Sequence, residues 1–312
     1  MQRRVVTVFG GSGFIGRHLV RRLAAEDWIV RVAVRDTESA MFLKVAGDPG
    51  QVVPLAADIG NAASVARAVE GAGAVINLVG ILYERGRRTF QRMHVEAAGT
   101  VASAAKAAGA SRLVHMSAIG ADAESPAEYG RTKAAGERAV REAFPEASIV
   151  RPSVVFGQED DFLNRFAGMA RVTPVLPVFP TEFQPVWVGD VAEAIARVLQ
   201  DPATAGKTYE LGGPRVVSFR ELMELILREI GRERLLLPLP LALAEIQAWF
   251  LEKLPVPPLT RDQVKLLGTA NVVGASALTL RDLGIEPTAL EAVVPSYLNR
   301  YRPQVKQRRR SA

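Results

Sequence analysis

The stretch VVTVFGGSGFIG, residues 5–16, decides the fold, because a run of apolar and β-branched residues leads directly into a glycine-rich turn. Its glycines Gly10, Gly13 and Gly16 have the spacing G-x-x-G-x-x-G. In a strand–turn–helix unit, the first glycine permits the tight turn, the second lets the backbone approach a ligand, and the third allows the helix to pack closely on the sheet. A helix that begins at this turn presents free N–H groups, so the turn is predicted to bind phosphate.

Short apolar runs and alanine-rich stretches alternate from Arg4 to about Ala147. The predicted strands are Val5–Phe9, Ile29–Val34, Val52–Ala56, Ala74–Leu78, Arg112–Ser117 and Ser148–Arg151. The helices predicted between them are Gly13–Glu26, Ala62–Glu70, His94–Ala108 and Tyr129–Ala143. Strict alternation of this kind predicts the α/β class, with a Rossmann-type doubly wound parallel sheet.

Beyond Arg151, prolines divide the chain into shorter elements, with one helix predicted at Gly189–Gln200. We expect a smaller C-terminal lobe in this half. The predicted division is a Rossmann domain at residues 1–151, remaining sheet elements interleaved with the small lobe at residues 152–303, and a basic disordered tail at residues 304–312.

The most apolar stretch of the chain, Leu235–Leu254, is interrupted by Pro238, Pro240 and charged residues. These interruptions are too frequent for a membrane-spanning helix. Two interpretations stay open: a core helix of the smaller lobe, or an interfacial helix that binds a partner. Capping-box spacing at Ser218 and Thr260 predicts two further helix starts in this half.

Composition narrows the possible functions. The chain contains no cysteine, and its three histidines, His18, His94 and His115, are too dispersed for a zinc site, so no metal is expected. The net charge is +6 and the pI is about 9.8, but the arginines lack the pattern of a nucleic-acid-binding domain, so no nucleic-acid partner is expected. The N-terminal MQRR runs directly into a strand without a signal peptide, which favours a cytoplasmic protein.

The ends of the predicted strands indicate the ligand. A dinucleotide fold presents a residue about 20 positions after the glycine turn to the adenosine ribose. Arg35, directly after the second strand, would pair with a 2′-phosphate and favour NADP(H), whereas Asp36 would favour NAD(H); we predict NADP(H), with NAD(H) less favoured. Asp58, after the third strand, either accepts from the adenine amino group or caps the next helix. The fourth strand ends on the same ligand-binding edge, at Leu78, Val79 and Gly80.

A second group of residues predicts a catalytic activity. Tyr129 and Lys133 are spaced i, i+4 and share one helix face, and Ser117 ends the fifth predicted strand. In this arrangement the lysine lowers the pKa of the tyrosine, the phenol exchanges a proton with a substrate oxygen, and the serine orients that oxygen. The pattern predicts hydride transfer to a carbonyl, although the same residues can serve only to hold the ribose and nicotinamide of the cofactor.

Together with RPSVVFG, residues 151–157, these motifs resemble the extended and atypical short-chain dehydrogenase/reductase superfamily, which is epimerase/dehydratase-like, over residues 4 to about 300. Within it, the strings GILYERGRRTF, RPSVVFGQEDDFLNRFA, FQPVWVGDVAEAI and PLTRDQVKLL are most similar to the NADPH-binding, dehydrogenase-like accessory subunits of respiratory complex I. The predicted cofactor-binding set is Gly10, Ser12, Gly13, Phe14, Ile15, Gly16, Arg35, Asp58, Leu78, Val79, Gly80, Ser117, Tyr129, Lys133, Pro152, Ser153 and Val154.

The resemblance implies a subunit that holds NADPH as a structural element, beside the peripheral-arm subunits of complex I and on the cytoplasmic side of a bacterial inner membrane, with contact to anionic lipid. One departure weighs against turnover: catalytic members have an Asn on the helix that here begins near His94, where this chain has His94 or Gln91. The alternative is a free-standing NADPH-dependent oxidoreductase, epimerase or dehydratase acting on a sugar-nucleotide or lipid-like carbonyl. A redox-sensing binder also stays open.

Overall fold

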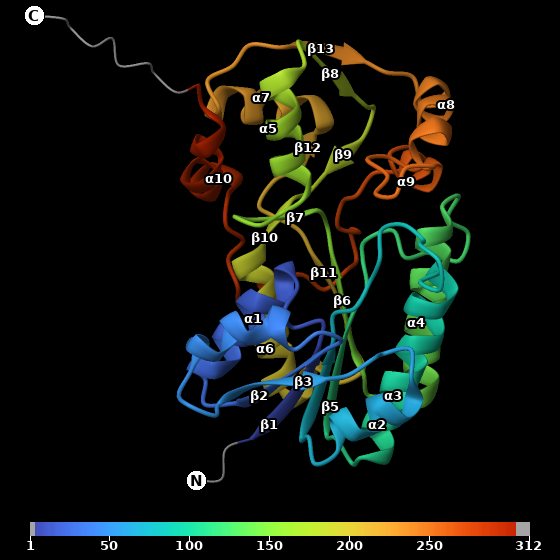
Figure 1. The fold of residues 1–312 in the computed structure, drawn as a ribbon, viewed down its shortest axis with the longest axis vertical. Helices are drawn as coiled ribbons and strands as arrows, with labels where there is room; N and C mark the ends of the chain where they lie inside the picture. Colours follow the sequence, from blue (N-terminus) through green and yellow to red (C-terminus); the bar gives the residue numbers. More distant parts are fainter. Residues whose placement is uncertain (1–3, 304–312) are drawn as a thin grey trace, which may run out of the picture.

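Seven strands form the central sheet, in the order β11-β6-β5-β4-β1-β2-β3. The computed structural model describes residues 4–303. The strands of this sheet are β1 (Val5–Phe9), β2 (Ile29–Val34), β3 (Val52–Ala56), β4 (Ala74–Asn77), β5 (Arg112–Met116), β6 (Ser148–Pro152) and β11 (Thr208–Leu211). Every neighbouring pair is parallel, so the predicted α/β class and doubly wound sheet are confirmed (Figure 1).

The chain changes direction across the sheet at β1. It proceeds outward through β2 and β3, and then crosses back to β4 on the other side of β1. Phe9 of β1 is in register with Ala33 of β2 and with Asn77 of β4, so the loops after these strands emerge side by side. Because open α/β sheets bind ligands at such a switch point, the fold places the glycine-rich turn where a ligand is expected.

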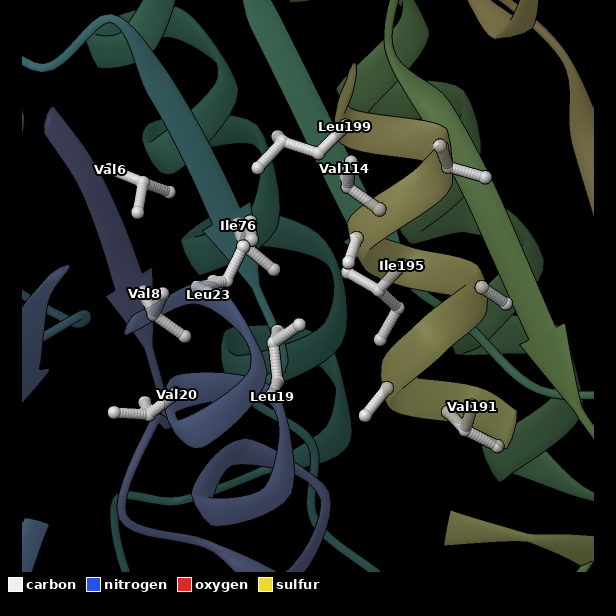
Figure 2. Packing of buried hydrophobic residues seen from close by; sticks show 14 of the residues in the cluster. Val6, Val8, Leu19, Val20, Leu23, Ile76, Val114, Val191, Ile195 and Leu199 are labelled. Carbon is white, nitrogen blue, oxygen red and sulfur yellow. The ribbon is translucent and has the colours of Figure 1, made fainter. Parts of the chain in front are cut away.

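Helices cover both faces of the sheet (Figure 1). One face carries α1 (Phe14–Ala25) and α6 (Val188–Gln200), and the other carries α2 (Ala62–Val69), α3 (Ala97–Ala107) and α4 (Glu128–Ala143). On the first face, fully buried Val8 and Ile76 of the sheet pack in one cluster with Leu19 of α1 and Ile195 of α6 (Figure 2). Each such side chain contributes about 1.5–3 kcal/mol by leaving water, so the sheet is a rigid base for the loops at its carboxyl edge.

The smaller lobe lies beyond the carboxyl end of the sheet (Figure 1). The remaining helices and short strands are α5 (Phe162–Val172), α7 (Phe219–Glu229), α8 (Leu241–Leu251), α9 (Arg261–Leu266), α10 (Leu290–Leu298), β7 (Val155–Phe156), β8 (Val175–Val178), β9 (Glu182–Phe183), β10 (Val186–Trp187), β12 (Val217–Ser218) and β13 (Leu235–Pro238). Phe219 contacts the rings of Phe162, Phe166, Phe179 and Phe183 at centroid distances of 5.2 to 5.9 Å. Phe219 directly follows the Ser218 capping box, so the predicted helix start there positions the centre of this lobe's core.

The structure of the segment Leu235–Leu254 bears on its two interpretations, a core helix of the smaller lobe or an interfacial helix. It forms β13 and α8, and α8 buries only Ala244 and Ala248. Leu243, Ile246, Trp249 and Phe250 stay exposed, so α8 adds only one narrow face to the core of the lobe and is not a fully buried core helix. The reason is the spacing of the small residues: the two alanines share one helix face four positions apart, and that face packs inward while the larger side chains face outward.

The start of one helix differs from its predicted position. The helix predicted to begin at His94 begins earlier, with a π-helix at Gln91–Glu96 ahead of α3. The predicted tail at residues 304–312 lies outside the described residues. Within residues 4–303, no helix has the length and apolar character needed to cross a membrane.

Candidate cofactor site

The glycine-rich turn is held in one conformation by its own backbone. Gly10 has a φ of +79°, a left-handed conformation that favours glycine, and its carbonyl accepts from the Gly13 N–H at 3.0 Å. A Cβ atom on Gly16 would lie 2.4 Å from the Gly10 oxygen and 2.6 Å from the Cα of Gly11. Gly16 is therefore needed for packing against the turn itself, rather than against the sheet as expected.

The first turn of α1 leaves its N–H groups available for an anion. The N-cap residue is Gly13, which has no side chain to accept them, and no acidic residue lies in the first turn. Ser12, Phe14 and Ile15 flank this helix start and are half-buried. Free N–H groups together with the positive end of the helix dipole attract phosphate. The turn therefore has the geometry that pyrophosphate binding requires.

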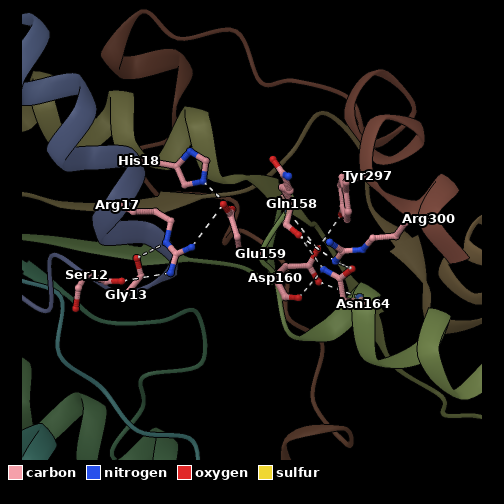
Figure 3. A network of polar contacts seen from close by, with 11 residues as sticks. Ser12, Gly13, Arg17, His18, Gln158, Glu159, Asp160, Asn164, Tyr297 and Arg300 are labelled. Carbon is pink, nitrogen blue, oxygen red and sulfur yellow. Dashed lines mark hydrogen bonds and ion pairs between the residues drawn. The ribbon is translucent and has the colours of Figure 1, made fainter. Parts of the chain in front are cut away.

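A polar network links this turn to the smaller lobe (Figure 3). Arg17 of α1 pairs with Glu159 at 3.6 Å, and His18 Nε2 lies 3.1 Å from the same carboxylate. The neighbouring Asp160 accepts a hydrogen bond from the Tyr297 hydroxyl of α10 at 2.8 Å. The network was not predicted from sequence, because its partners lie 141 and 137 positions apart and share no motif.

The two predicted adenosine contacts after β2, Arg35 and Asp36, differ in their surroundings. Arg35 is exposed and directly follows the last strand residue, Val34, as expected from the sequence. The Asp36 carboxylate accepts from the N–H of Glu38 at 3.0 Å, at the start of the 3-10 helix Glu38–Ala46. Oδ1 of Asp36 is thus used within its own loop, whereas the exposed Arg35 directly follows the strand.

Asp58 follows β3 and forms a local turn. Its Oδ1 accepts from the Gly60 N–H at 2.9 Å. Asn61, rather than Asp58, caps α2 by accepting from the Ser64 N–H at 3.1 Å. The helix-capping alternative for Asp58 is therefore wrong, and its exposed carboxylate keeps an oxygen for another partner.

The segment Leu78-Val79-Gly80 connects the glycine turn to the second group of predicted residues. A Cβ atom on Gly10 would lie 3.3 Å from Val79 Cγ2 and 3.5 Å from the Leu78 carbonyl carbon. A Cβ atom on Gly80 would lie 3.3 Å from Lys133 Nζ. The two predicted halves of the site therefore meet at this segment.

Ser117, Tyr129 and Lys133 gather beside it. Lys133 Nζ donates to the carbonyl of Met116, next to Ser117, at 3.2 Å and lies 5.9 Å from the ring centroid of Tyr129. Ser117 Oγ is buried and has no hydrogen-bond partner among residues 4–303. Burial lowers the pKa of Lys133 to about 8 and raises the pKa of Tyr129 to about 12. The expected lowering of the tyrosine pKa is therefore not found, because burial disfavours the charged form of the phenol.

His94 contacts Tyr129 of this cluster and lies within hydrogen-bonding distance of Thr132 on the same helix. Its Nε2 accepts from the Ile81 N–H at 3.1 Å, which assigns the proton to Nδ1, and Nδ1 lies 3.1 Å from Thr132 Oγ1. The imidazole is edge-on to the ring of Tyr129, with centroids 5.3 Å apart. Burial lowers the pKa of His94 to about 3. Of the two residues considered in place of the superfamily's Asn, His94 lies in the cluster, and Gln91 is exposed.

Pro152, Ser153 and Val154 lie at the end of β6, but their polar groups are already used. Ser153 Oγ donates to the Asn271 side-chain oxygen at 2.7 Å, and the same oxygen accepts from the Val154 N–H at 3.1 Å. Asn271 also donates to the carbonyl of Ile119 at 3.3 Å. Asn271 was missed in the sequence because it lies in an irregular segment without a motif.

A cleft of about 680 Å³ opens between the carboxyl edge of the sheet and the smaller lobe. Tyr83, Glu84 and Phe90 line it from the loop after β4, Glu128 lines it from α4, and α8 and α9 form the opposite wall. Phe90 also packs edge-on against Tyr129, with ring centroids 6.0 Å apart. The cleft therefore borders the Tyr129 cluster.

Comparison with known proteins places this chain in a family. The NmrA-like family model matches residues 2–247. The mitochondrial NADH-ubiquinone oxidoreductase 40 kDa subunit of Neurospora crassa is 35% identical over 297 residues, covering 95% of this chain and 79% of the relative. The mitochondrial NADH dehydrogenase (ubiquinone) 1 alpha subcomplex subunit 9 of Arabidopsis thaliana is 38% identical over 313 residues, covering 96% of this chain and 78% of the relative.

Solved structures agree on the fold. DesIV, a dTDP-glucose 4,6-dehydratase from Streptomyces venezuelae with NAD and TYD bound, is 20% identical and has a TM-score of 0.74, covering 95% of this chain and 96% of that one. The fold is thus an NAD(P)-binding Rossmann fold. The chain belongs to the NmrA-like family and, by its extended similarity, to the family of the mitochondrial NADH-ubiquinone oxidoreductase 40 kDa and alpha subcomplex 9 subunits.

Proposed function

We propose that this chain is an NADP(H)-binding accessory subunit of an NADH:quinone oxidoreductase, respiratory complex I, and that it holds the cofactor without turnover. The observation that carries the proposal is similarity along almost the whole chain to proteins named as subunits of that enzyme. The intact glycine turn supports the binding part, because a subunit without a cofactor would not need its phosphate-binding geometry.

The residues present fit a dinucleotide. The first turn of α1 would hold the pyrophosphate, and Lys133 and Tyr129 would hold the nicotinamide ribose. Ser117 Oγ is a buried hydroxyl without a partner among residues 4–303, and such a group costs about 1–3 kcal/mol unless a ligand bonds it. When bound, the nicotinamide can supply or accept a hydride.

Arg35 supports NADP(H) over NAD(H). Arg35 directly follows β2, where the sequence pattern predicts the contact with the adenosine ribose, and one oxygen of Asp36 accepts from the N–H of Glu38. A guanidinium pairs with a 2′-phosphate by charge-assisted hydrogen bonds, which a free 2′-hydroxyl cannot match.

His94 supports retention without turnover. Both of its ring nitrogens are engaged by protein groups, the Ile81 N–H and the Thr132 hydroxyl. Its pKa of about 3 keeps it neutral at physiological pH, so it does not exchange protons with a substrate there. The proton of Tyr129 is also held strongly, because burial raises its pKa to about 12.

The exposed face of α8 supports attachment to a larger assembly. Leu243, Ile246 and Phe250 are 54%, 60% and 61% exposed, and Trp249 is 43% exposed. An apolar surface of this kind on a subunit is covered by a partner. We propose that a peripheral-arm subunit of the complex covers α8, on the cytoplasmic side of a bacterial inner membrane, where the basic residues of the chain also contact anionic lipid.

The alternative function is a free-standing NADPH-dependent oxidoreductase, epimerase or dehydratase for a sugar-nucleotide or lipid-like carbonyl. The Ser117 hydroxyl, which has no hydrogen-bond partner in the described part of the chain, favours it, because beside Tyr129 and Lys133 that group could orient a substrate oxygen. The purified chain decides between the two: bound NADPH that stays reduced in the presence of such carbonyls supports the accessory role, and steady NADPH oxidation supports the enzyme.

A further inference from the structure

The string PLTRDQVKLL plays no part in the proposed cofactor contacts, yet it reaches the helix that carries Tyr129 and Lys133. Thr260 and Gln263 form a reciprocal capping box at the start of α9. Asp262 lies between them, in the first turn of the helix. The capping box therefore fixes the backbone from which the Asp262 carboxylate extends.

Asp262 accepts two hydrogen bonds from the start of α4. The N–H of Glu128 donates to Oδ1 at 2.6 Å, and the N–H of Tyr129 donates to Oδ2 at 3.0 Å. The N-cap residue of α4 is Ala127, whose methyl group cannot accept either bond. The first N–H groups of a helix need an acceptor outside the helix, and a carboxylate also interacts favourably with the positive helix end. A residue 133 and 134 positions away thus caps α4.

Two more contacts hold the same wall of the cleft. Gln263 Nε2 donates to the carbonyl of Leu82, after β4, at 3.4 Å. Arg261 pairs with Glu252, just past α8, at 2.7 Å, so α8 and α9 are joined. The wall made by α8 and α9 therefore meets the nucleotide-binding half at Leu82 and at the start of α4, and Asp262 makes the shorter of these contacts.

We propose that Asp262 is a positioning residue, which fixes α4 to the smaller lobe and holds residues 241–266 closed over the Tyr129–Lys133 end of the cofactor site. Loss of its carboxylate would free the wall and let a bound dinucleotide leave faster. This inference rests on the proposed NADP(H) binding for its second half. The closure itself is a property of the chain without cofactor and is measured separately.

The test compares Asp262→Ala with Asp161→Ala in the full chain. The Asp161 side chain is 73% exposed in the same lobe and pairs with Arg165 one helical turn away, so its removal controls for the loss of one surface carboxylate. Amide hydrogen exchange is measured without nucleotide in peptides covering residues 128–133 and 252–266, and NADPH release is then followed by fluorescence from the loaded chain. We expect Asp262→Ala to speed exchange in both peptides and to speed NADPH release by roughly tenfold, the effect of losing one helix cap. Asp161→Ala leaves all three unchanged.

A second variant separates closure from helix capping. Ala127→Ser, added to Asp262→Ala, gives α4 a cap from its own segment. It is expected to restore slow exchange at residues 128–133, but not at residues 252–266, and NADPH release stays fast. Asp262→Asn keeps one acceptor oxygen and is expected to give intermediate rates, so it replaces Asp262→Ala if that variant does not fold.

The outcomes are distinct. Slow exchange at residues 252–266 in Asp262→Ala, or slow NADPH release restored by Ala127→Ser, overturns the proposal. If Asp262→Ala exchanges faster than the wild type as expected but the wild-type chain binds no NADPH, the closure stands and the proposed cofactor role fails.

Discussion

The pH dependence of stability tests whether His94 is buried in its neutral form, with hydrogen bonds to Ile81 and Thr132. The perturbation is His94→Gln, because a glutamine side chain can still accept from the Ile81 N–H and donate to Thr132 Oγ1, the two bonds that the imidazole makes. Glutamine does not titrate. A difference between the two proteins that changes as the pH falls therefore reports the protonation of His94 alone, since His115 titrates in both.

The sign and size follow from the pKa. Burial lowers the pKa of His94 to about 3 in the folded chain, against an ordinary value near 6.5 in the unfolded chain. Between these values only the unfolded state takes up the proton, so stability is present above pH 6.5 and is lost as the pH falls towards 3. The cost per pH unit rises to about 1.4 kcal/mol once the unfolded histidine is fully protonated, and it is smaller near pH 6.5, where that histidine is half protonated. The wild type therefore loses about 2 kcal/mol more than the variant between pH 6.5 and pH 4.5. His94 is 2% exposed, so solvent does not reduce this figure greatly.

Urea unfolding of both proteins at pH 7.0, 6.0, 5.0 and 4.5 measures the difference in the free energy of unfolding. The dependence of this free energy on urea concentration, the m-value, is determined for each protein at pH 7.0 and then kept constant. We expect the free energy of unfolding of the wild type to fall towards that of His94→Gln, or below it, as the pH drops. Parallel pH profiles for the two proteins would show that His94 is not buried in the neutral state, and its hydrogen bonds to Ile81 and Thr132 would have to be abandoned.

Three other substitutions give direct tests. Arg35→Ala should weaken NADPH binding by roughly ten- to a hundredfold and leave NADH binding almost unchanged, because the lost group pairs with the extra phosphate; equal weakening in fluorescence titrations contradicts the NADP(H) assignment. Gly16→Ala should abolish nucleotide binding and lower the melting temperature, because its Cβ would lie 2.4 Å from the Gly10 oxygen; an unchanged melting temperature contradicts the turn geometry. Phe250→Asp should fold normally, because Phe250 is 61% exposed, but should not co-purify with the complex; retained co-purification rejects the α8 surface.

The nucleotide-binding half could be predicted closely from sequence. Strands β1, β2 and β3 have the predicted bounds. For β1 and β2 the reason is that buried parallel strands are largely apolar runs that glycine or polar residues end sharply. The turn at residues 10–16 and the position of Arg35 follow from the same local pattern. Local backbone requirements, such as the positive φ of Gly10, depend on the identity of single residues, so one sequence is enough to predict them.

Contacts between distant segments could not be predicted in this way. Asp262, Asn271 and Glu159 each act on an element more than a hundred positions away, and no periodicity or spacing connects them to it. The pKa of Tyr129 was expected to fall because the lysine was visible in the motif, but burial, which depends on the whole fold, raises it. The exposure of α8 was likewise undecided, because an apolar helix is the same in sequence whether its own chain or a partner covers it.

The central claim is tested most directly by isolating the natively expressed, tagged protein from gently solubilised membranes. Mass spectrometry identifies its partners, and the bound nucleotide is assayed in the same sample. The account predicts stoichiometric recovery with the subunits of complex I and retained NADPH. A protein recovered free of those subunits, whether or not it carries nucleotide, would contradict the accessory role and make a free-standing reductase or epimerase the leading account.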